Sequence, residues 1–434
     1  MAKTYRPYCP DQMFLLPPSL RDWLPENHLV YFVSDVVDQL NLSKIESVYE
    51  KDGRGQPPFH PRMMTKILVY AYCVGVFSSR KIQKRLVEDI AFRVLAAGNQ
   101  PDFRTISDFR KIHLDALQNL FEQVLKLALT AGAIKLGRVA LDGSKVKANA
   151  SKHKAMSYKR MKEDERKLRA EVRQLLKQAK AADEEEDARY GKDRSGDELP
   201  EELSRRETRL QRIKEAKKAL EQRAREEAKK SEESKNSEEK AIPEDKAQYN
   251  FTDPESRIMK GSDGFVQAYN SQVVVEQGSQ LIVAQAVTQE ANDKKQTVPM
   301  MEAIKEQSGQ TPEQLLADSG YCSEENLNLL ENKPIDVYIA TGRQKHGKKS
   351  IRCKRGPLPK GATKVDKMRR KLQTKAGAAV YAARKAIVEP VFGQIKQARG
   401  FRQFLLRGIR KVRGEWALVC ATHNILKMYR LCYG

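Results

Sequence analysis

The stretch VALDGSKVKANAS, residues 139–151, contains a short apolar run that ends at Asp142 and turns into a polar, basic segment. The alternation in residues 136–142 predicts a β-strand with Asp142 at its C-terminal end. In an α/β sheet, ligands gather at the carboxyl ends of the strands. An Asp-Gly pair after a strand is also a common turn, so Asp142 alone leaves both interpretations open. The residues that follow could donate to phosphate oxygens: Ser144, Lys145, Lys147 and Asn149.

Two further carboxylates repeat the pattern of an acid beside an apolar run. A short buried strand is predicted to end at Asp318, before a helix that Ser323 opens. Glu389 lies between Val388 and Val391 in a helical stretch, which predicts a position on or near a buried face. A buried carboxylate needs a partner or a metal ion. Three such acids supply the hard oxygen ligands that a pair of Mg²⁺ ions requires, so we expect Asp142, Asp318 and Glu389 to converge.

Without metal, such a cluster is expected to be poorly organised. Two carboxylates about 4 Å apart repel each other by about 4 kcal/mol at an effective dielectric constant near 20. Cation binding would relieve this repulsion.

The charge of the chain points to a polyanionic partner. The 434 residues include 80 Lys and Arg against 57 Asp and Glu, a formal net charge of +23 at pH 7. Such an excess indicates nucleic acid, because solubility needs only a few net charges. The six cysteines form no C-x-x-C pair, which argues against both a zinc knuckle and a disulfide framework. No G-x-x-x-x-G-K-[ST] phosphate loop occurs, so we expect no nucleotide cofactor.

The apolar segments favour a cytoplasmic location. The N-terminus lacks the apolar core of a signal peptide. The longest apolar run, ILVYAYCVGVF, is about half the length that a membrane helix needs. We therefore expect a soluble, cytoplasmic protein with no membrane partner.

Composition divides the chain into three parts. Residues 1–135 are predicted to be helical, either as a helix-turn-helix-like DNA-binding domain or as a plain bundle with solvated charges. Residues 157–244 are rich in Lys, Arg and Glu and carry two apolar stripes, which favours an antiparallel helical hairpin over a charged, disordered insert. Residues 136–156 and 245–434 contain the predicted strands, including a pair joined at Gln277-Gly278, then a basic loop over 343–371 and terminal helices.

Three segments resemble bacterial insertion-sequence transposases of the DDE, RNase H-like class. They are ALDGSKVKANAS, LADSGY and YAARKAIVEPVFGQIKQARGFRQFLLRG. The chain is most similar to the insertion sequence eleven-eighty-two group, within the superfamily that has a Tyr-Arg-Glu-Lys signature. The N-terminal FHPRMMTKILVYAYCVGVFSSRKIQKRL and PDFRTISDFRK are similar to that family's helical end-binding domain. The resemblance implies an α/β fold with an RNase H-like mixed sheet and flanking helices, preceded by an all-helical domain and interrupted by the hairpin as an insertion.

The resemblance also implies roles for individual residues. The two aspartates and the glutamate that hold the metal ions fall on Asp142, Asp318 and Glu389. The signature lysine is Lys396, and the signature tyrosine and arginine are Tyr381 and Arg384. Arg384 lies five residues before Glu389 where the signature has four, and Lys385 stands at the signature distance as its rival. The expected DNA contacts are completed by Lys145, Arg399, Arg402 and Arg407.

The function that follows is Mg²⁺-dependent transposition. The enzyme would bind the terminal inverted repeats of its element, cut a phosphodiester and transfer the freed 3′ end to target DNA, with two Mg²⁺ ions, or Mn²⁺ in their place. Pairing of two DNA ends implies a homodimer or a higher assembly on DNA. The alternatives are an RNase H-like nuclease without strand transfer, and a transposase-derived protein that binds DNA without catalysis.

Overall fold

A computed structural model describes residues 19–49, 57–190, 201–230, 242–261, 264–342, 356, 359 and 361–434. Most of the basic loop predicted over 343–371 and the predicted turn at 191–200 lie outside these residues. The end of that predicted loop is helix α12, Lys364–Gln373, which begins at a capping box between Thr363 and Asp366. No described helix has the length and apolar character needed to cross a membrane.

A six-stranded mixed sheet forms the centre of the molecule. Its order is β4-β5-β1-β7-β8, with β6 also paired to β5. β1 pairs antiparallel with β5 and parallel with β7, and β7 pairs parallel with β8. The strands are β1 Arg138–Lys147, β4 Arg257–Gly261, β5 Gly264–Glu276, β6 Ile282–Thr288, β7 Gln314–Ala317 and β8 Asp336–Ile339. The predicted strand pair joined at Gln277-Gly278 is thus confirmed as β5 and β6.

The prediction that β1 ends at Asp142 is wrong. The strand continues to Lys147, because β5 is thirteen residues long and pairs with β1 along the whole stretch from Val139 to Lys147. The pairing with β7 is shorter and stops at Leu141. Asp142 therefore lies within β1, just past the point where the neighbouring parallel strand β7 ends.

In the described part of the chain, seven α-helices precede the sheet: α1 Leu29–Gln39, α2 Ser43–Glu46, α3 Pro61–Cys73, α4 Ser79–Glu88, α5 Ile90–Ala96, α6 Phe103–Ile112 and α7 Leu114–Thr130. Helices α4 and α5 are separated at Asp89, which caps α5 by accepting a hydrogen bond from the amide of Ala91 at 3.0 Å. Helices α6 and α7 are separated at His113, whose side chain makes no capping hydrogen bond.

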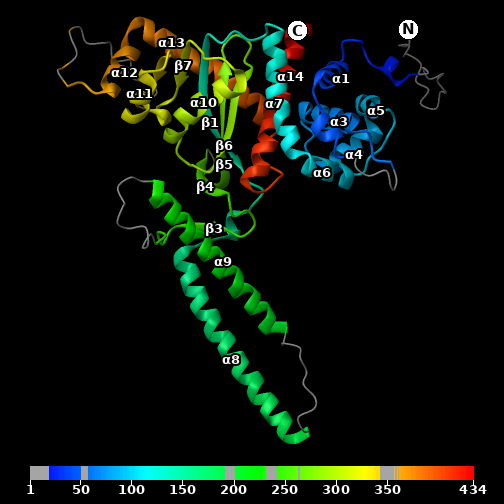
Figure 1. The fold of residues 1–434 in the computed structure, drawn as a ribbon, viewed down its shortest axis with the longest axis vertical. Coiled ribbons are helices and arrows are strands. Elements are labelled where there is room, and N and C mark those ends of the chain that lie inside the picture. Colours follow the sequence, from blue (N-terminus) through cyan, green and yellow to red (C-terminus); the bar gives the residue numbers. More distant parts are fainter. Residues whose placement is uncertain are drawn as a thin grey trace, which may run out of the picture.

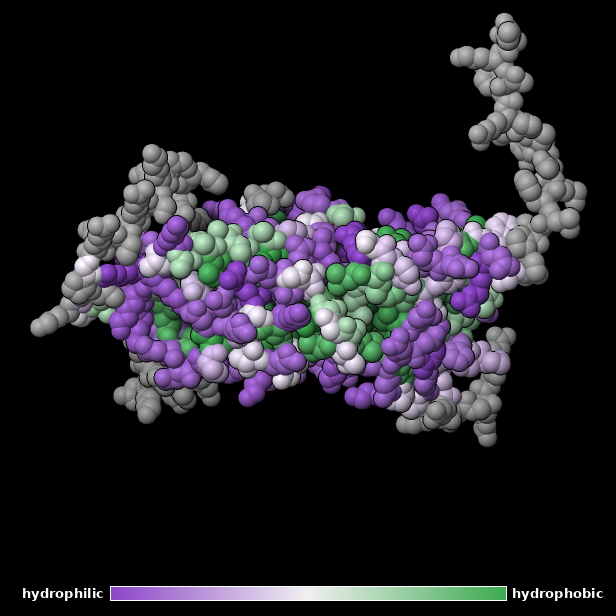
Figure 2. All heavy atoms as spheres, turned by 90° about the horizontal axis from the view of Figure 1, so that it is seen from above, coloured by the Kyte–Doolittle hydropathy of each residue, from purple (hydrophilic) through white to green (hydrophobic). Residues whose placement is uncertain are grey.

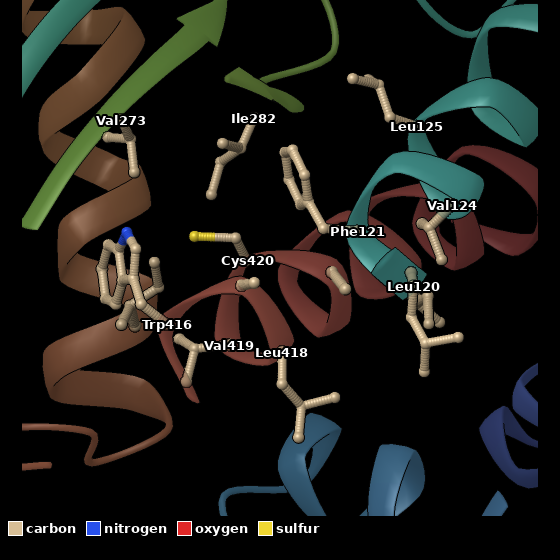
Figure 3. Packing of buried hydrophobic residues seen from close by; sticks show 14 of the residues in the cluster. Leu120, Phe121, Val124, Leu125, Val273, Ile282, Trp416, Leu418, Val419 and Cys420 are labelled. Atoms are coloured by element: carbon tan, nitrogen blue, oxygen red, sulfur yellow. The ribbon is translucent and has the colours of Figure 1, made fainter. Parts of the chain in front are cut away.

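One hydrophobic core runs from the N-terminal helices into the sheet. Helix α14, Ile409–Tyr433, packs against α7, α3 and β6. In Figure 3, Phe121 of α7, Cys420 of α14 and Ile282 of β6 meet in this core. Helices α10 Thr297–Ser308 and α13 Lys375–Gly393 further cover the sheet, and α11 Glu324–Glu331 packs against α10 and α12. The N-terminal helices and the sheet therefore share their buried surface.

The charged segment forms the predicted antiparallel hairpin, which projects from the body of the molecule (Figure 1). Its helices are α8, Tyr158–Tyr190, and α9, Glu201–Lys230, and a small sheet of β2, Ala155–Ser157, and β3, Gln248–Asn250, joins them to the body. The hairpin has its own hydrophobic cluster, separate from the main core: Tyr158, Met161, Leu168, Leu210, Ile213, Ala216 and Leu220. Seen from the end opposite the hairpin, hydrophilic side chains flank a central band of hydrophobic ones (Figure 2).

Candidate active site

The register of the sheet brings Asp142 and Asp318 together. β1 and β7 run parallel with Leu141 beside Ala317, so the next residue on each strand is one of the two aspartates. The Asp142 carboxylate accepts a hydrogen bond from the Gly143 amide at 2.8 Å, and that of Asp318 accepts one from the Gly320 amide at 2.8 Å. The parallel pairing of β1 with β7 thus brings together two aspartates that are far apart in the sequence. We call Asp142 and Asp318 the acidic pair.

Arg384 of α13 supplies the positive charge at this pair. Its guanidinium donates to the Asp142 carboxylate at 3.2 Å, and the side chains of Arg384 and Asp142 are 11% and 21% exposed. Burial raises the pKa of Asp142 to about 6, against the lowering effect of Arg384 and with a further rise from the Asp318 charge. Lys385, the rival by spacing, is exposed. The acidic pair that we expected to be poorly organised without metal is therefore held by an arginine.

The buried Asp142 carboxyl predicts a cost to stability that depends on pH. The pKa of Asp142 rises from 3.8 to about 6 on folding, so between these values the folded state holds a proton that the unfolded state has released. The free energy of unfolding then falls as pH rises through this window, by about 3 kcal/mol in total. Because asparagine resembles the protonated carboxyl, we expect Asp142→Asn to raise the melting temperature in EDTA near neutral pH and to change it little below the window.

Thermal unfolding of both proteins at the two pH values checks this expectation. A shift of equal size at both would show that the charge of Asp142 is not its source.

Tyr381 and Lys396 also lie at the acidic pair. Burial raises the pKa of Tyr381, Arg384 lowers it, and the charges of Asp318 and Asp142 raise it further. Lys396 lies in a π-helical turn, Gln394–Ala398, and its ammonium donates to the Ser144 hydroxyl and to the Lys145 carbonyl at 3.0 Å. Burial lowers the pKa of Lys396, partly offset by Asp142. The helix thus places tyrosine, arginine and lysine along β1.

Glu389 does not lie where the sequence predicted it. It is exposed on α13, whereas Ile387, Val388 and Val391 on either side of it are buried. The apolar neighbours face the sheet, and at helical spacing this turns Glu389 toward solvent. Among the residues that the structure describes, no three His, Cys, Asp or Glu side chains form a group that could hold a metal ion. The expected three-acid cluster is therefore not assembled here.

Asp293 is a site residue that the sequence analysis missed. Its carboxylate accepts hydrogen bonds from Asn270 at 2.6 Å, from Gln272 at 2.9 Å and from Lys145 at 3.1 Å. A side chain at Gly143 would collide with Gln272 and approach Asp293, which explains the glycine beside Asp142. Asp293 follows β6 in an irregular segment with no apolar pattern, so only the pairing of β5 with β1 reveals it.

Gln272 extends this network beneath the acidic pair. It accepts a hydrogen bond from the buried hydroxyl of Tyr321. Burial, together with the charges of Asp293, Asp142 and Asp318, raises the pKa of Tyr321 well above its ordinary value. The phenol is therefore a neutral donor that fixes the orientation of Gln272, which lies on β5 opposite Gly143 of β1.

Two of the residues predicted to contact DNA, Lys145 and Arg399, bind groups within the protein instead. Lys145 pairs with Asp293 at 3.1 Å and is 16% exposed, so its ammonium is part of the acidic network. Arg399 is buried and donates to the Thr422 hydroxyl at 2.8 Å and to the Val419 carbonyl at 3.1 Å. Burial lowers the pKa of Arg399 to about 10. The expectation that Arg399 contacts DNA is wrong, because its guanidinium ties the end of α13 to α14.

Arg402 and Arg407 remain exposed beside the end of β1. Arg402 donates to the Lys396 carbonyl at 3.2 Å, and Arg407 donates to the Asn149 carbonyl at 2.9 Å. Each arginine thus keeps most of its guanidinium donors toward solvent.

Two neighbouring aspartates lie on a mixed sheet among basic side chains. This arrangement is typical of enzymes that act on phosphate esters. Comparison with protein families makes the class specific. Residues 242–425 match the family described as Transposase DDE domain, and residues 18–112 match the family described as Transposase domain (DUF772). The two matches support an insertion-sequence DDE transposase, an enzyme that acts on DNA. Comparisons with curated proteins and with solved structures found no match.

The matched segments leave out the middle of the chain. Asp318 and Glu389 lie inside the second segment, whereas Asp142 and the hairpin lie between the two. The assignment of Asp142 to the site therefore depends on the pairing of its strand, β1, with β5 and β7.

Proposed function

We propose that the protein is a DDE transposase of the Tyr-Arg-Glu-Lys superfamily, most similar to the insertion sequence eleven-eighty-two group. It cuts the ends of its element and joins them to target DNA. The observation that carries this proposal is that Asp142 and Asp318 directly follow the paired residues Leu141 of β1 and Ala317 of β7, with Arg384 of the signature helix on Asp142. The order β6-β5-β1-β7-β8, three antiparallel strands followed by two parallel ones, supports the RNase H-like fold that the Transposase DDE domain implies.

Asp142 and Asp318 are the residues that would hold divalent metal ions. Both are carboxylates, the hard oxygen ligands that Mg²⁺ and Mn²⁺ take, and Asp142 lies in a buried setting that already requires a counter-charge. Glu389 completes the proposed set of ligands. Metal ions, when bound, supply activation of water and stabilisation of the leaving 3′ oxygen in an in-line displacement.

The basic residues around the pair have separate tasks in this proposal. Arg384 neutralises Asp142 before DNA arrives. Lys396 lies within hydrogen-bonding distance of β1 and is placed to donate to a phosphate oxygen near the cut. Tyr381 shares the same helix face and positions Arg384. Arg402 and Arg407 hold the phosphate backbone beyond the site.

The N-terminal helices are proposed to bind the DNA ends. Helix α4 carries exposed cations over its length: Arg80, Lys81, Lys84 and Arg85. Three of them line a hollow of about 490 Å³ next to Gly75. We propose residues 1–135 as this end-binding part, 136–156 and 245–434 as the catalytic part, and 157–244 as the inserted hairpin. Because two ends must be held together, the active form on DNA is a homodimer or larger.

A strand-transfer assay tests the proposal. Purified protein, Mg²⁺ and labelled duplexes of the element's terminal sequence with a recessed 3′ end are expected to yield joined products with a target plasmid. Cleaved ends without any joined product would instead favour an RNase H-like nuclease. Binding without cleavage in either Mg²⁺ or Mn²⁺ would identify a transposase-derived protein that has lost catalysis.

A further inference from the structure

A basic cavity lies at the base of the hairpin, remote from the acidic pair. It has a volume of about 350 Å³ and is formed by the turn before β2, the beginning of α8, the middle of α9 and the residue after β3. Its lining residues include five with basic side chains and none with an acidic one: His153, Lys154, Arg160, Arg209 and Arg212. The cavity is therefore positively charged.

Most of this positive charge is not neutralised by the protein. Arg209 pairs with Asp164 at 3.4 Å. Within the described part of the chain, no carboxylate lies within ion-pair distance of Arg160 or Arg212, and both side chains are exposed. Guanidinium groups gathered around a hollow without counter-ions favour phosphate, which they bind through paired N–H donors.

The rest of the cavity wall is apolar and firmly held. Ile213 is buried in the hairpin cluster. Phe251 is 37% exposed, and its ring packs edge-on against that of Tyr249, with 5.5 Å between the ring centroids. The Phe251 backbone amide donates a hydrogen bond to the Lys154 carbonyl at 3.1 Å. An exposed aromatic ring beside phosphate-binding arginines suits a nucleotide, whose sugar and base need an apolar contact.

A row of cations connects the cavity to the acidic pair. Lys147, at the end of β1, forms no ion pair with the described residues. Its backbone amide donates a hydrogen bond to the Arg402 carbonyl at 3.3 Å. Arg407 contacts the backbone of Asn149 at 2.9 Å, two residues further along. The exposed side chains of Lys152 and Lys154 follow and reach the cavity. Asp142 lies about 17 Å before the end of β1, so the cavity is beyond reach of the nucleotide being cut.

We propose that this cavity binds a phosphodiester of the same DNA strand, several nucleotides away from the cut. The inference rests on the proposed function for the identity of the polyanion. The hairpin thereby acts as a second DNA clamp, with Arg160 and Arg212 on the phosphate and Phe251 against the adjoining nucleotide.

The test measures binding of the full-length protein to a labelled linear DNA duplex over a series of salt concentrations. Each arginine that neutralises a phosphate contributes about 0.9 to the slope of log affinity against log salt. The double variant Arg160→Ala/Arg212→Ala is expected to lower the slope by about 2 and to weaken binding about ten-fold or more. Arg160→Lys/Arg212→Lys is expected to keep most of the slope, and Phe251→Ala to weaken binding with the slope unchanged.

The matched control is Arg166→Ala/Arg173→Ala, which removes the same charge from exposed positions of α8 outside the cavity. Equal slopes for the two double variants, both folded by thermal unfolding, would overturn the proposal. So would altered self-association of the cavity variant with DNA affinity unchanged, since the occupant would then be protein. A wild-type protein that binds no DNA would instead overturn the proposed function itself.

Discussion

Asp142→Asn and Asp318→Asn are each expected to abolish Mg²⁺-dependent strand cleavage while leaving DNA binding intact. The two carboxylates are adjacent in the register of β1 and β7, so loss of either negative charge removes half of the metal-binding pair. Metal ions contribute several kcal/mol of transition-state stabilisation, and each 1.36 kcal/mol is a factor of ten, so we expect rates to fall about 10³-fold or more. DNA affinity is set by cations elsewhere and should stay within about two-fold of wild type.

Single-turnover cleavage of a labelled end, with binding measured in parallel, checks this result. Asp108→Asn is a suitable control, because that aspartate is exposed on α6 and forms an ion pair with Lys111, away from the acidic pair. Cleavage at the wild-type rate by Asp142→Asn would remove that residue from the active site.

Glu389→Gln is expected to lower cleavage about 10²- to 10³-fold, although the side chain of Glu389 is exposed. If Glu389 is the third metal ligand, it must come to the acidic pair when metal and DNA are bound. Pro390 lies within α13, which then gives way to the π-helical turn at Gln394–Ala398. These irregularities weaken the helix next to Glu389 and leave room for such a shift.

Asp293 is the alternative candidate for the third metal-binding carboxylate, because it already lies beside Gly143 and Gly320. Asp293→Asn should impair activity by releasing Lys145, without weakening the apparent Mg²⁺ affinity, whereas Glu389→Gln should raise the Mg²⁺ concentration needed for half-maximal cleavage. The reverse pattern would assign the third ligand to Asp293. Glu302→Gln, on the exposed face of α10, is the control for loss of a surface carboxylate.

Local apolar patterns, an alternation before Asp142 and a short apolar run before Asp318, were sufficient to predict the two strands beside the acidic pair. Leu141 and Ala317 precede Asp142 and Asp318 in buried runs, and the polar residue after such a run marks the point where burial ends. The hairpin was predictable for a similar reason, since its apolar stripes recur at helical spacing in an otherwise charged segment. Local patterns of this kind depend only on near neighbours in the chain.

Spacing alone could not choose between Arg384 and Lys385. The rotation of α13 is set by the burial of Ile387, Val388 and Val391, which turns Arg384 toward Asp142 and leaves Lys385 in solvent. The same rotation exposes Glu389, although its apolar neighbours in the sequence predicted a position on or near a buried face.

The sequence by itself determined the charge of the chain and predicted the strands and the convergence of Asp142 with Asp318, and its resemblance to DDE transposases implied the class of enzyme. The tertiary structure decided where the charged groups lie: Arg384 faces Asp142, Asp293 binds Lys145, and the Arg399 guanidinium donates to Thr422 and Val419 of α14. The physical reason is that a charge can be buried only where a distant partner compensates it, and the sequence does not display distant partners.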